Sequence, residues 1–274
     1  MPLELISIPT DTLALDGLYY TPDTPAKNAA LFLHGNCMNF YTGPARMVPP
    51  PLMKLGYACL AFNRRGHDMI ATTNSRAVTG GAFQTTKEAV TDNRCAAGFL
   101  KARGFAAPIV IGHSNGGMLS VQHVADHPET PALVLLSAHL GGTQVVPLAS
   151  KVGLLGGERI AEVEAEARRM VAAGRGAELM LLPGWWHVIT AESYLDYCAT
   201  LPDVLALAPR ITCPVLYIRG DKEPPHIYPA EEFAKRAGGP CEVAIVPDCD
   251  HFYGGREDAV MGIVAGWLAR LDKT

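Results

Sequence analysis

Short apolar runs recur along this chain and are separated by longer segments of mixed polarity. The first two runs alternate apolar and polar residues around the turn-forming pair Asp16-Gly17, which predicts two antiparallel strands. The later runs are continuously apolar and bounded by turn residues, as expected of strands buried on both faces. The predicted strands are residues 3–8, 12–20, 29–33, 57–62, 108–112, 132–137, 215–218 and 242–246.

Segments with helical periodicity lie between most of these strands. Strand followed by helix, repeated along a chain, is typical of a mostly parallel sheet covered by helices on both faces. The pattern therefore predicts an α/β fold with such a central sheet. The predicted helices are residues 45–55, 85–103, 117–127, 230–237 and 258–271.

One interval breaks this alternation, because residues 138–214 are far longer than a crossover of about a dozen residues. Its first part, GERIAEVEAEARRMVAAGRG, is rich in helix-forming residues and ends in glycines, and residues 191–200 predict a second helix. We expect a core of residues 1–139 and 211–274 and an inserted helical lid of residues 140–210. A ligand crevice lies at the carboxyl ends of parallel strands, so the lid is expected to cover it.

Composition excludes several classes of protein. The chain has 274 residues, of which 49% are hydrophobic and 18% charged, so it can bury a large core. A net charge of −4 offers no basic surface for nucleic acid or acidic lipid. We therefore expect a small-molecule substrate and no nucleic-acid or membrane partner. The oligomeric state stays open, and the lid offers one surface for a homodimer.

Seven scattered cysteines without a C-x-x-C pair indicate neither a disulfide framework nor a zinc site. The N-terminal segment lacks the basic start and continuous apolar block of a signal peptide, and no apolar run is long enough to span a membrane. A cytoplasmic location fits these observations.

The stretch IVIGHSNGGMLS places one serine between glycines where a strand gives way to a helix. Gly112 to Gly116 fits G-x-S-x-G, a tight strand-to-helix turn that exposes the serine as a nucleophile. This short pattern occurs by chance in many chains, so residues elsewhere in the sequence must show whether Ser114 is a catalytic nucleophile. The alternative to a nucleophile is that Ser114 is an ordinary helix-capping residue.

A serine nucleophile needs a base to take its proton and an acid to orient that base. Asp221 follows the strand ending near residue 218, and His251 follows the strand ending near residue 246. The chain order Ser114, Asp221, His251 is the one expected for such a turn in this kind of sheet. Glu223 and Asp248 are nearby alternatives for the acid, whereas Asp250 adjoins the histidine and is expected to stabilise its loop.

Acyl transfer also needs two preset N–H donors for the oxyanion. Asn115, directly after the serine at a helix N-terminus, is expected to supply one. The loop LFLHGNCMNF is expected to supply the other, from Asn36 or else Cys37. The chain has no phosphate-binding glycine loop and no metal-ligand spacing, so we expect neither cofactor nor metal.

The segments LFLHGN, AFNRRGH, IVIGHSNGG, YIRGD and CDHF, in this order, resemble the α/β-hydrolase superfamily. The resemblance extends from about residue 29 to residue 271. It implies that Ser114 is the nucleophile, His251 the base and Asp221 its acid, with Asn36 and Asn115 as oxyanion donors. The insertion would correspond to the family's variable cap. Asn63 departs from the family, where many members have aspartate, and Asn115 replaces a more usual apolar residue.

The candidate substrate-binding residues are aromatic or polar side chains near the expected cleft. Trp185, Trp186 and His187 either fill the lid core or line the pocket, and Tyr41 lies close to the predicted oxyanion loop.

The sequence thus predicts a serine hydrolase that cleaves a carboxylic ester, lactone or thioester through an acyl-enzyme. A carbon–carbon bond of a diketone or an amide is an alternative substrate for the same residues. An alternative of another class is a ligand-binding module that kept the fold without its chemistry.

Overall fold

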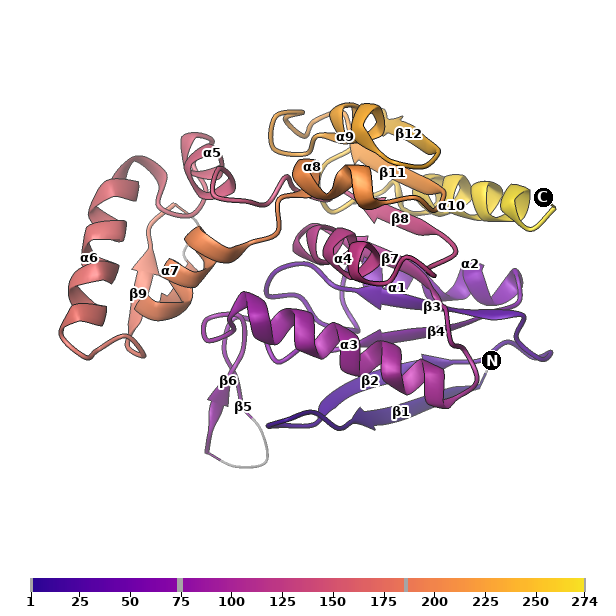
Figure 1. The fold of residues 1–274 in the computed structure, drawn as a ribbon, viewed down its shortest axis with the longest axis horizontal. Coiled ribbons are helices and arrows are strands. Elements are labelled where there is room, and N and C mark those ends of the chain that lie inside the picture. The colour runs from indigo at the N-terminus through magenta and orange to yellow at the C-terminus, as the bar shows by residue number, and fades with distance from the viewer. Residues whose placement is uncertain (1, 73–75, 185–186, 274) are drawn as a thin grey trace.

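An eight-stranded sheet organises the protein. The computed structural model describes residues 2–72, 76–184 and 187–273. The strands lie in the order β1-β2-β4-β3-β7-β8-β11-β12 (Figure 1). Only β2 runs antiparallel to its neighbours, and the other adjacent pairs are parallel. Their bounds are β1 Leu3–Ile8, β2 Leu15–Tyr20, β3 Asn28–Leu33, β4 Tyr57–Phe62, β7 Ile109–His113, β8 Leu133–Leu136, β11 Val215–Gly220 and β12 Cys241–Val246.

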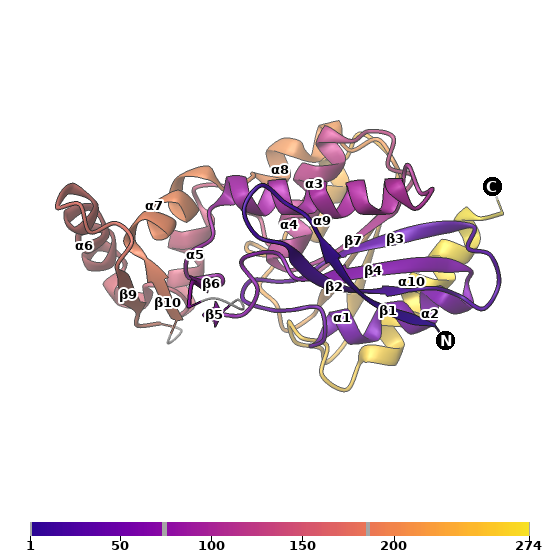
Figure 2. The same ribbon diagram turned by 90° about the horizontal axis from the view of Figure 1, so that it is seen from below.

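Helices cover both faces of this sheet (Figure 2). Side chains alternate along each strand, so Leu31 and Leu33 enter the core on one face and Phe32 the core on the other. The first face carries α3 Thr86–Ala102, α4 Asn115–Asp126, α8 Val204–Leu207 and α9 Ala230–Arg236, and the second carries α1 Pro44–Met47, α2 Pro49–Lys54 and α10 Glu257–Leu271. The predicted α/β fold is confirmed.

Two local sequence features explain how these helices begin. The side chain of Thr85 accepts the N–H of Glu88 while Glu88 accepts the N–H of Thr85, and this capping box starts α3. The single helix predicted over residues 45–55 is instead two short helices, α1 and α2, which meet at Val48. Pro49, Pro50 and Pro51 lack the N–H groups that would continue α1.

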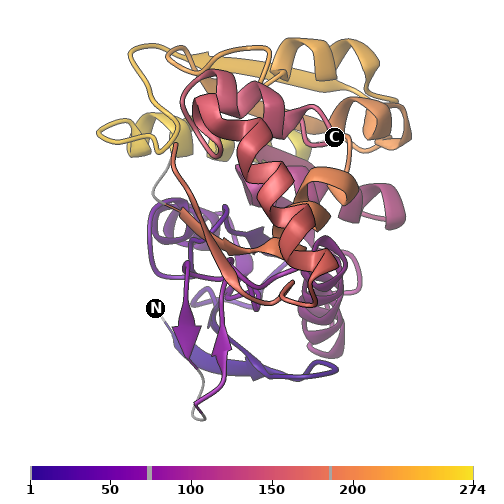
Figure 3. The same ribbon diagram turned by 90° about the vertical axis from the view of Figure 1, so that its left-hand side faces the viewer.

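The segment from residue 140 to residue 201, called the inserted segment below, projects beyond the carboxyl ends of the parallel strands (Figures 1 and 3). It contains the two predicted helical pieces, as α6 and α7, and an antiparallel pair of strands that the sequence did not predict, β9 and β10. Its elements are α5 Val145–Lys151, η1 Gly157–Arg159, α6 Ile160–Ala172, β9 Leu179–Leu182, β10 His187–Thr190 and α7 Ala191–Thr200.

The remaining elements are small. A two-stranded hairpin, β5 Ala71–Thr72 with β6 Val78–Thr79, follows β4, and η2 Ala208–Arg210 follows α8. Among the described helices, none has the length and hydrophobicity needed to cross a bilayer.

Candidate active site

Ser114 occupies a strained turn between β7 and α4. Its φ of 55° lies in the left-handed region that side chains rarely adopt. A Cβ on Gly112 would lie 2.4 Å from the carbonyl oxygen of Gly116, and one on Gly116 would lie 2.1 Å from that of Leu33. Only glycine fits at both positions, as the motif predicts. Ser114 makes no capping bond to α4, so the helix-capping alternative does not hold.

His251 reaches this serine from the loop after β12. Its Nε2 lies 2.9 Å from Ser114 Oγ, so neutral His251 is placed to accept the hydroxyl proton. The Nε2 of His113 lies 2.9 Å from the backbone oxygen of His251, and since a carbonyl only accepts, His113 donates. Burial, together with the nearby His251, lowers the pKa of His113 to about 3, which keeps its imidazole neutral. His113 thus holds the backbone that carries His251.

The carboxylate behind this histidine is Glu223. His251 Nδ1 lies 2.7 Å from Glu223 Oε1, and the Glu223 side chain is only 3% exposed. The structure therefore corrects the predicted acid: Asp221 does not contact His251. Asp221 is exposed and accepts the backbone N–H groups of Asp248 and Cys249, at 2.9 and 3.0 Å.

Those two backbone donors lower the pKa of Asp221, which holds the loop after β11 against the loop after β12. The other acidic alternatives also have separate partners. Asp248 pairs with Arg256 and Lys222, and Asp250 accepts the N–H of Phe252. The expected loop-stabilising role of Asp250 agrees with this bond.

A buried hydrogen-bond network fixes the orientation of Glu223. Its Oε2 accepts the Ser137 hydroxyl at 2.6 Å and the Gly220 N–H at 2.8 Å. The Tyr253 hydroxyl lies 2.6 Å from Ser137 Oγ and donates to it. Both oxygens of this buried carboxylate thus accept hydrogen bonds, so the group is satisfied and its rotation is restricted. Sequence inspection missed this network because its members come from three distant segments.

The predicted oxyanion residues lie beside the serine. Asn36 lines the cavity that contains Ser114, and Asn115 is the first residue of α4. The N–H groups of the first helical turn have no intrahelical partner, so that of Asn115 stays available. Within the described residues, the N–H of Asn36 donates no backbone hydrogen bond. A Cβ on Gly35 would lie 3.3 Å from that of Ser114, which shows how closely the two loops approach.

A cavity of about 240 Å³ opens at Ser114 and His251. Its remaining lining is mainly apolar and includes Met38, Val145, Ala149, Leu154, Leu155 and Ile227. This chamber, called the larger chamber below, is formed by the sheet core and the inserted segment together. A group that binds here is removed from water, which strengthens each polar interaction with it.

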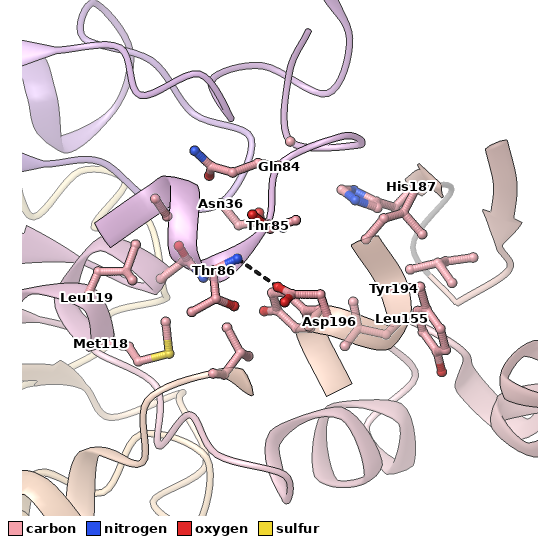
Figure 4. Close-up of a pocket in the computed structure, with 17 residues that line it drawn as sticks. Asn36, Gln84, Thr85, Thr86, Met118, Leu119, Leu155, His187, Tyr194 and Asp196 are labelled. Atoms are coloured by element: carbon pink, nitrogen blue, oxygen red, sulfur yellow. Dashed lines mark hydrogen bonds between the residues drawn. The ribbon is translucent and has the colours of Figure 1, made fainter. Parts of the chain in front are cut away.

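The predicted substrate-binding residues have different outcomes. Trp185 and Trp186 lie outside the described residues. His187 is buried and lines a second, smaller chamber beside Asn36 and Asn115 (Figure 4). Tyr41 is 52% exposed and is absent from the lining of both chambers, so its prediction as a cavity residue is wrong. Its ring instead packs edge-on against Phe40.

Three residues that the sequence did not indicate also line the larger chamber: His139, Tyr197 and Tyr228. The Tyr228 ring centroid is 5.0 Å from that of His251. His139 accepts the Gly141 N–H at Nδ1, so its proton is on Nε2. Burial, with His251 nearby, lowers the pKa of His139 to about 3. These three residues lie in different segments of the sequence and share no motif, so only the fold brings them together.

No group of three His, Cys, Asp or Glu side chains within the described ranges is arranged to hold a metal ion. The seven cysteines are free, and burial raises the pKa of the Cys37 thiol to about 12. Ser114 lines the larger chamber and hydrogen-bonds to the imidazole of His251, so it can act as a nucleophile.

The chain belongs to the Alpha/beta hydrolase family, whose profile matches residues 30–262. The sheet order, the strained serine turn and the histidine beyond the last strand are consistent with this membership. A comparison with curated protein sequences finds no match.

Solved structures share the fold at low identity. Est1E from Butyrivibrio proteoclasticus with bound ferulic acid has a TM-score of 0.74 and 17% identity, covering 98% of this chain and 100% of that one. A thermostable carboxyl esterase from Bacillus coagulans has a TM-score of 0.74 and 15% identity, covering 99% of each chain. Proline iminopeptidase from Mycobacterium smegmatis has a TM-score of 0.64 and 18% identity, covering 98% of this chain and 99% of that one.

Proposed function

We propose that this protein is a serine hydrolase that cleaves a carboxylic ester, lactone or thioester of a small molecule through an acyl-enzyme intermediate. The observation that carries the proposal is the line of two hydrogen bonds from Ser114 to His251, 2.9 Å, and from His251 to Glu223, 2.7 Å. In this line each group has the partner that activates it.

In the first half-reaction, His251 accepts the proton of Ser114 as its oxygen attacks the carbonyl carbon. Glu223 keeps the second ring proton on Nδ1 and stabilises the imidazolium that forms. The developing oxyanion is placed near the N–H groups of Asn36 and Asn115, which stabilise it without reorganisation. The imidazolium then donates its proton to the leaving oxygen or sulfur, and the acyl-enzyme remains.

In the second half-reaction, His251 accepts a proton from water, whose oxygen attacks the acyl carbon. The collapse of the second oxyanion breaks the bond to Ser114, which takes back the proton from His251. Apart from the substrate, the cycle requires only water. We further propose that the inserted segment acts as a cap, since its residues close one side of the larger chamber.

An ester is the first choice of substrate. The chamber is mainly apolar, and its described lining residues include no Lys or Arg, which suits an uncharged acyl or alkyl group. One of the similar folds described above is a carboxyl esterase by name, which supports the same choice. The proline iminopeptidase by name keeps amide hydrolysis as the second candidate.

The test is labelling with a fluorophosphonate, followed by mass spectrometry of the labelled peptide. Wild type is expected to be labelled at Ser114, Ser114→Ala to remain unlabelled, and His251→Ala to react far more slowly. Ser120→Ala serves as a matched control, because Ser120 lies on α4 with its hydroxyl bonded to the Gly116 carbonyl.

Failure of folded wild-type protein to react, together with no turnover of short p-nitrophenyl esters, would contradict the proposal. That result would favour a binding module that retains the fold without the chemistry.

A further inference from the structure

A second chamber of about 40 Å³, called the smaller chamber below, adjoins the cavity beside Ser114. The two chambers share three lining residues, Asn36, Leu155 and Tyr197. Ser114 and His251 line the larger chamber only, whereas Asn115 lines the smaller one only. The shared residues therefore lie at the boundary between the larger chamber, which contains Ser114 and His251, and the smaller chamber.

Tyr197 has the largest side chain at this boundary. It projects from α7 of the inserted segment and lines both chambers, so its ring stands between them. Burial raises the pKa of Tyr197, so the hydroxyl stays protonated at neutral pH.

The smaller chamber differs in chemistry from the larger one. Figure 4 shows the carboxylate of Asp196 facing the N-terminus of α3, where it accepts the Thr86 N–H at 2.7 Å. Gln84 and His187 line the same space. Burial lowers the pKa of His187, and no Lys or Arg is among the lining residues of this chamber. Asp196 is the one carboxyl group among its described lining residues, and such a group accepts hydrogen bonds from donors and disfavours a second carboxylate beside it.

Its volume limits what can enter. A bound water needs about 10–15 Å³ of such space, so the chamber holds a terminal group of a few heavy atoms rather than a second ring. A hydroxyl-bearing end of a chain fits both this size and the acceptor on Asp196.

We propose that Tyr197 is a specificity-determining residue that divides the substrate site, and that the smaller chamber receives the hydroxyl end of an acyl chain whose apolar body occupies the larger chamber. The inference rests on the proposed ester hydrolysis and extends it to a substrate class. When a long chain binds, the Tyr197 ring turns aside and the chain end enters beside Asp196. Shorter chains end at the ring and leave it in place.

The experiment compares kcat/KM for methyl esters of three acyl series: plain alkanoates, ω-hydroxyalkanoates and ω-carboxyalkanoates of increasing length. Hydrolysis is followed by proton release. In wild type, the longer ω-hydroxy esters are expected to exceed ω-carboxy esters of equal length by about tenfold, as expected of one well-placed polar contact. Asp196→Asn keeps an oxygen for the Thr86 N–H and removes the charge, so it should reduce this discrimination.

Variants at Tyr197 test the boundary itself. Tyr197→Ala should raise the ratio of long-chain to short-chain kcat/KM by about tenfold, since it joins the two chambers. Tyr197→Phe keeps the ring and removes only the hydroxyl, so it should raise the ratio less. Tyr41→Ala removes an exposed tyrosine away from both chambers and should leave the ratio unchanged.

The outcomes separate this inference from the proposed function. If Tyr197→Ala is folded and active on short esters with the wild-type length profile, the dividing role is wrong while ester hydrolysis stands. If wild type does not distinguish hydroxyl from carboxylate ends, the substrate class is wrong. If wild type hydrolyses no ester and Ser114 is not labelled, the proposed function and this inference fall together.

Discussion

The carboxyl edge of the sheet and the inserted segment contribute differently to the same cavity. At the sheet edge, Ser114, Ser137 and Tyr253 have φ values of 55°, 46° and 62°, and buried hydrogen bonds hold their positions. Strained backbone of this kind persists only where the surroundings determine it fully. The reacting groups are thus placed by many contacts at once.

The inserted segment meets the core through apolar side chains of the shared hydrophobic cluster and through hydrogen bonds. Its bonds to the core include Thr190 N–H to the Ala82 carbonyl and Thr86 N–H to Asp196. Its outer surface shows exposed Leu179 and Leu181 beside ion pairs along α6. The reacting groups are thus positioned by the carboxyl edge of the sheet, whereas the inserted segment shapes the far side of the larger chamber.

The largest expected effect separates two carboxylates of the same loop. Glu223→Gln keeps the shape and removes the charge that orients His251, so kcat/KM on an ester should fall about 10³- to 10⁴-fold, as when a triad acid becomes an amide. Asp221→Asn changes an exposed group without contact to His251 and should cost less than about tenfold. Steady-state kinetics on both variants measures the difference. Equal losses of kcat/KM in the two variants would mean that the contact between Glu223 and His251 does not account for catalysis.

A second pair compares glycines of the two regions. A methyl at Gly116 would meet the Leu33 carbonyl oxygen at 2.1 Å, so Gly116→Ala should lower the free energy of unfolding by about 3 kcal/mol or more. Gly174, at the end of α6, has a φ of 72° and open space around its added Cβ. Gly174→Ala should therefore cost only the left-handed strain, about 1–2 kcal/mol. Urea unfolding of both variants measures the two losses of stability. A larger loss in Gly174→Ala than in Gly116→Ala would contradict this expectation.

Acid should destabilise the protein through the buried histidines of the sheet edge. His113 and His139 have pKa values lowered from 6.5 to about 3 by burial. Below pH 6.5 the unfolded chain binds protons that the folded chain does not, so the stability present at neutral pH is lost as the pH falls toward 3. At about pH 5 each such histidine should reduce the free energy of unfolding by about 2 kcal/mol.

The measurement is urea unfolding at neutral pH and at about pH 5 for wild type and His139→Asn. The variant should lose less stability between the two conditions than wild type. His226→Asn, at an exposed position, is the control and should behave as wild type does. An unchanged pH dependence in His139→Asn would show that His139 binds its proton equally in both states.

The smallest effect is expected on the outer surface of the inserted segment. Arg168 and Glu164 form an exposed i,i+4 pair on α6 with side chains 67% and 43% exposed. Such a pair contributes about 0.5 kcal/mol or less to stability, so Arg168→Ala should barely shift the urea midpoint and leave ester kinetics unchanged. A large loss of activity in this variant would mean that the outer face of α6 also shapes the chamber.

Much of the fold could be predicted from apolar periodicity. All eight strands of the sheet follow runs that are buried on both faces or alternate, and α3, α4 and α10 follow helical patterns with clear starts. The antiparallel pair β9–β10 was missed because each strand has only 4 residues, and so short a pair is stable only when packed against other elements such as α6 and α7. The break in the predicted helix 45–55 follows from three consecutive prolines that the periodicity alone did not weigh.

Of the candidate site, the serine and the histidine could be predicted and the acid could not. Asp221 and Glu223 both follow β11 within a few residues, so local pattern does not distinguish them. Which carboxylate orients His251 depends on hydrogen bonds from distant segments. The N–H groups of Asp248 and Cys249 donate to Asp221, whereas the Ser137 hydroxyl donates to Glu223. Tyr41 and Tyr197 show the same difficulty, since an aromatic residue in the sequence does not reveal which way its ring turns.

The sequence by itself determined the strand order along the chain, the glycine-bounded serine turn and the histidine loop, because short-range sterics and hydrophobic periodicity act on neighbouring residues. Only the tertiary structure decided which carboxylate orients His251 and which tyrosine separates the two chambers. Those outcomes depend on hydrogen bonds and burial between segments far apart in the chain, and each such contact exists only once the sheet has formed.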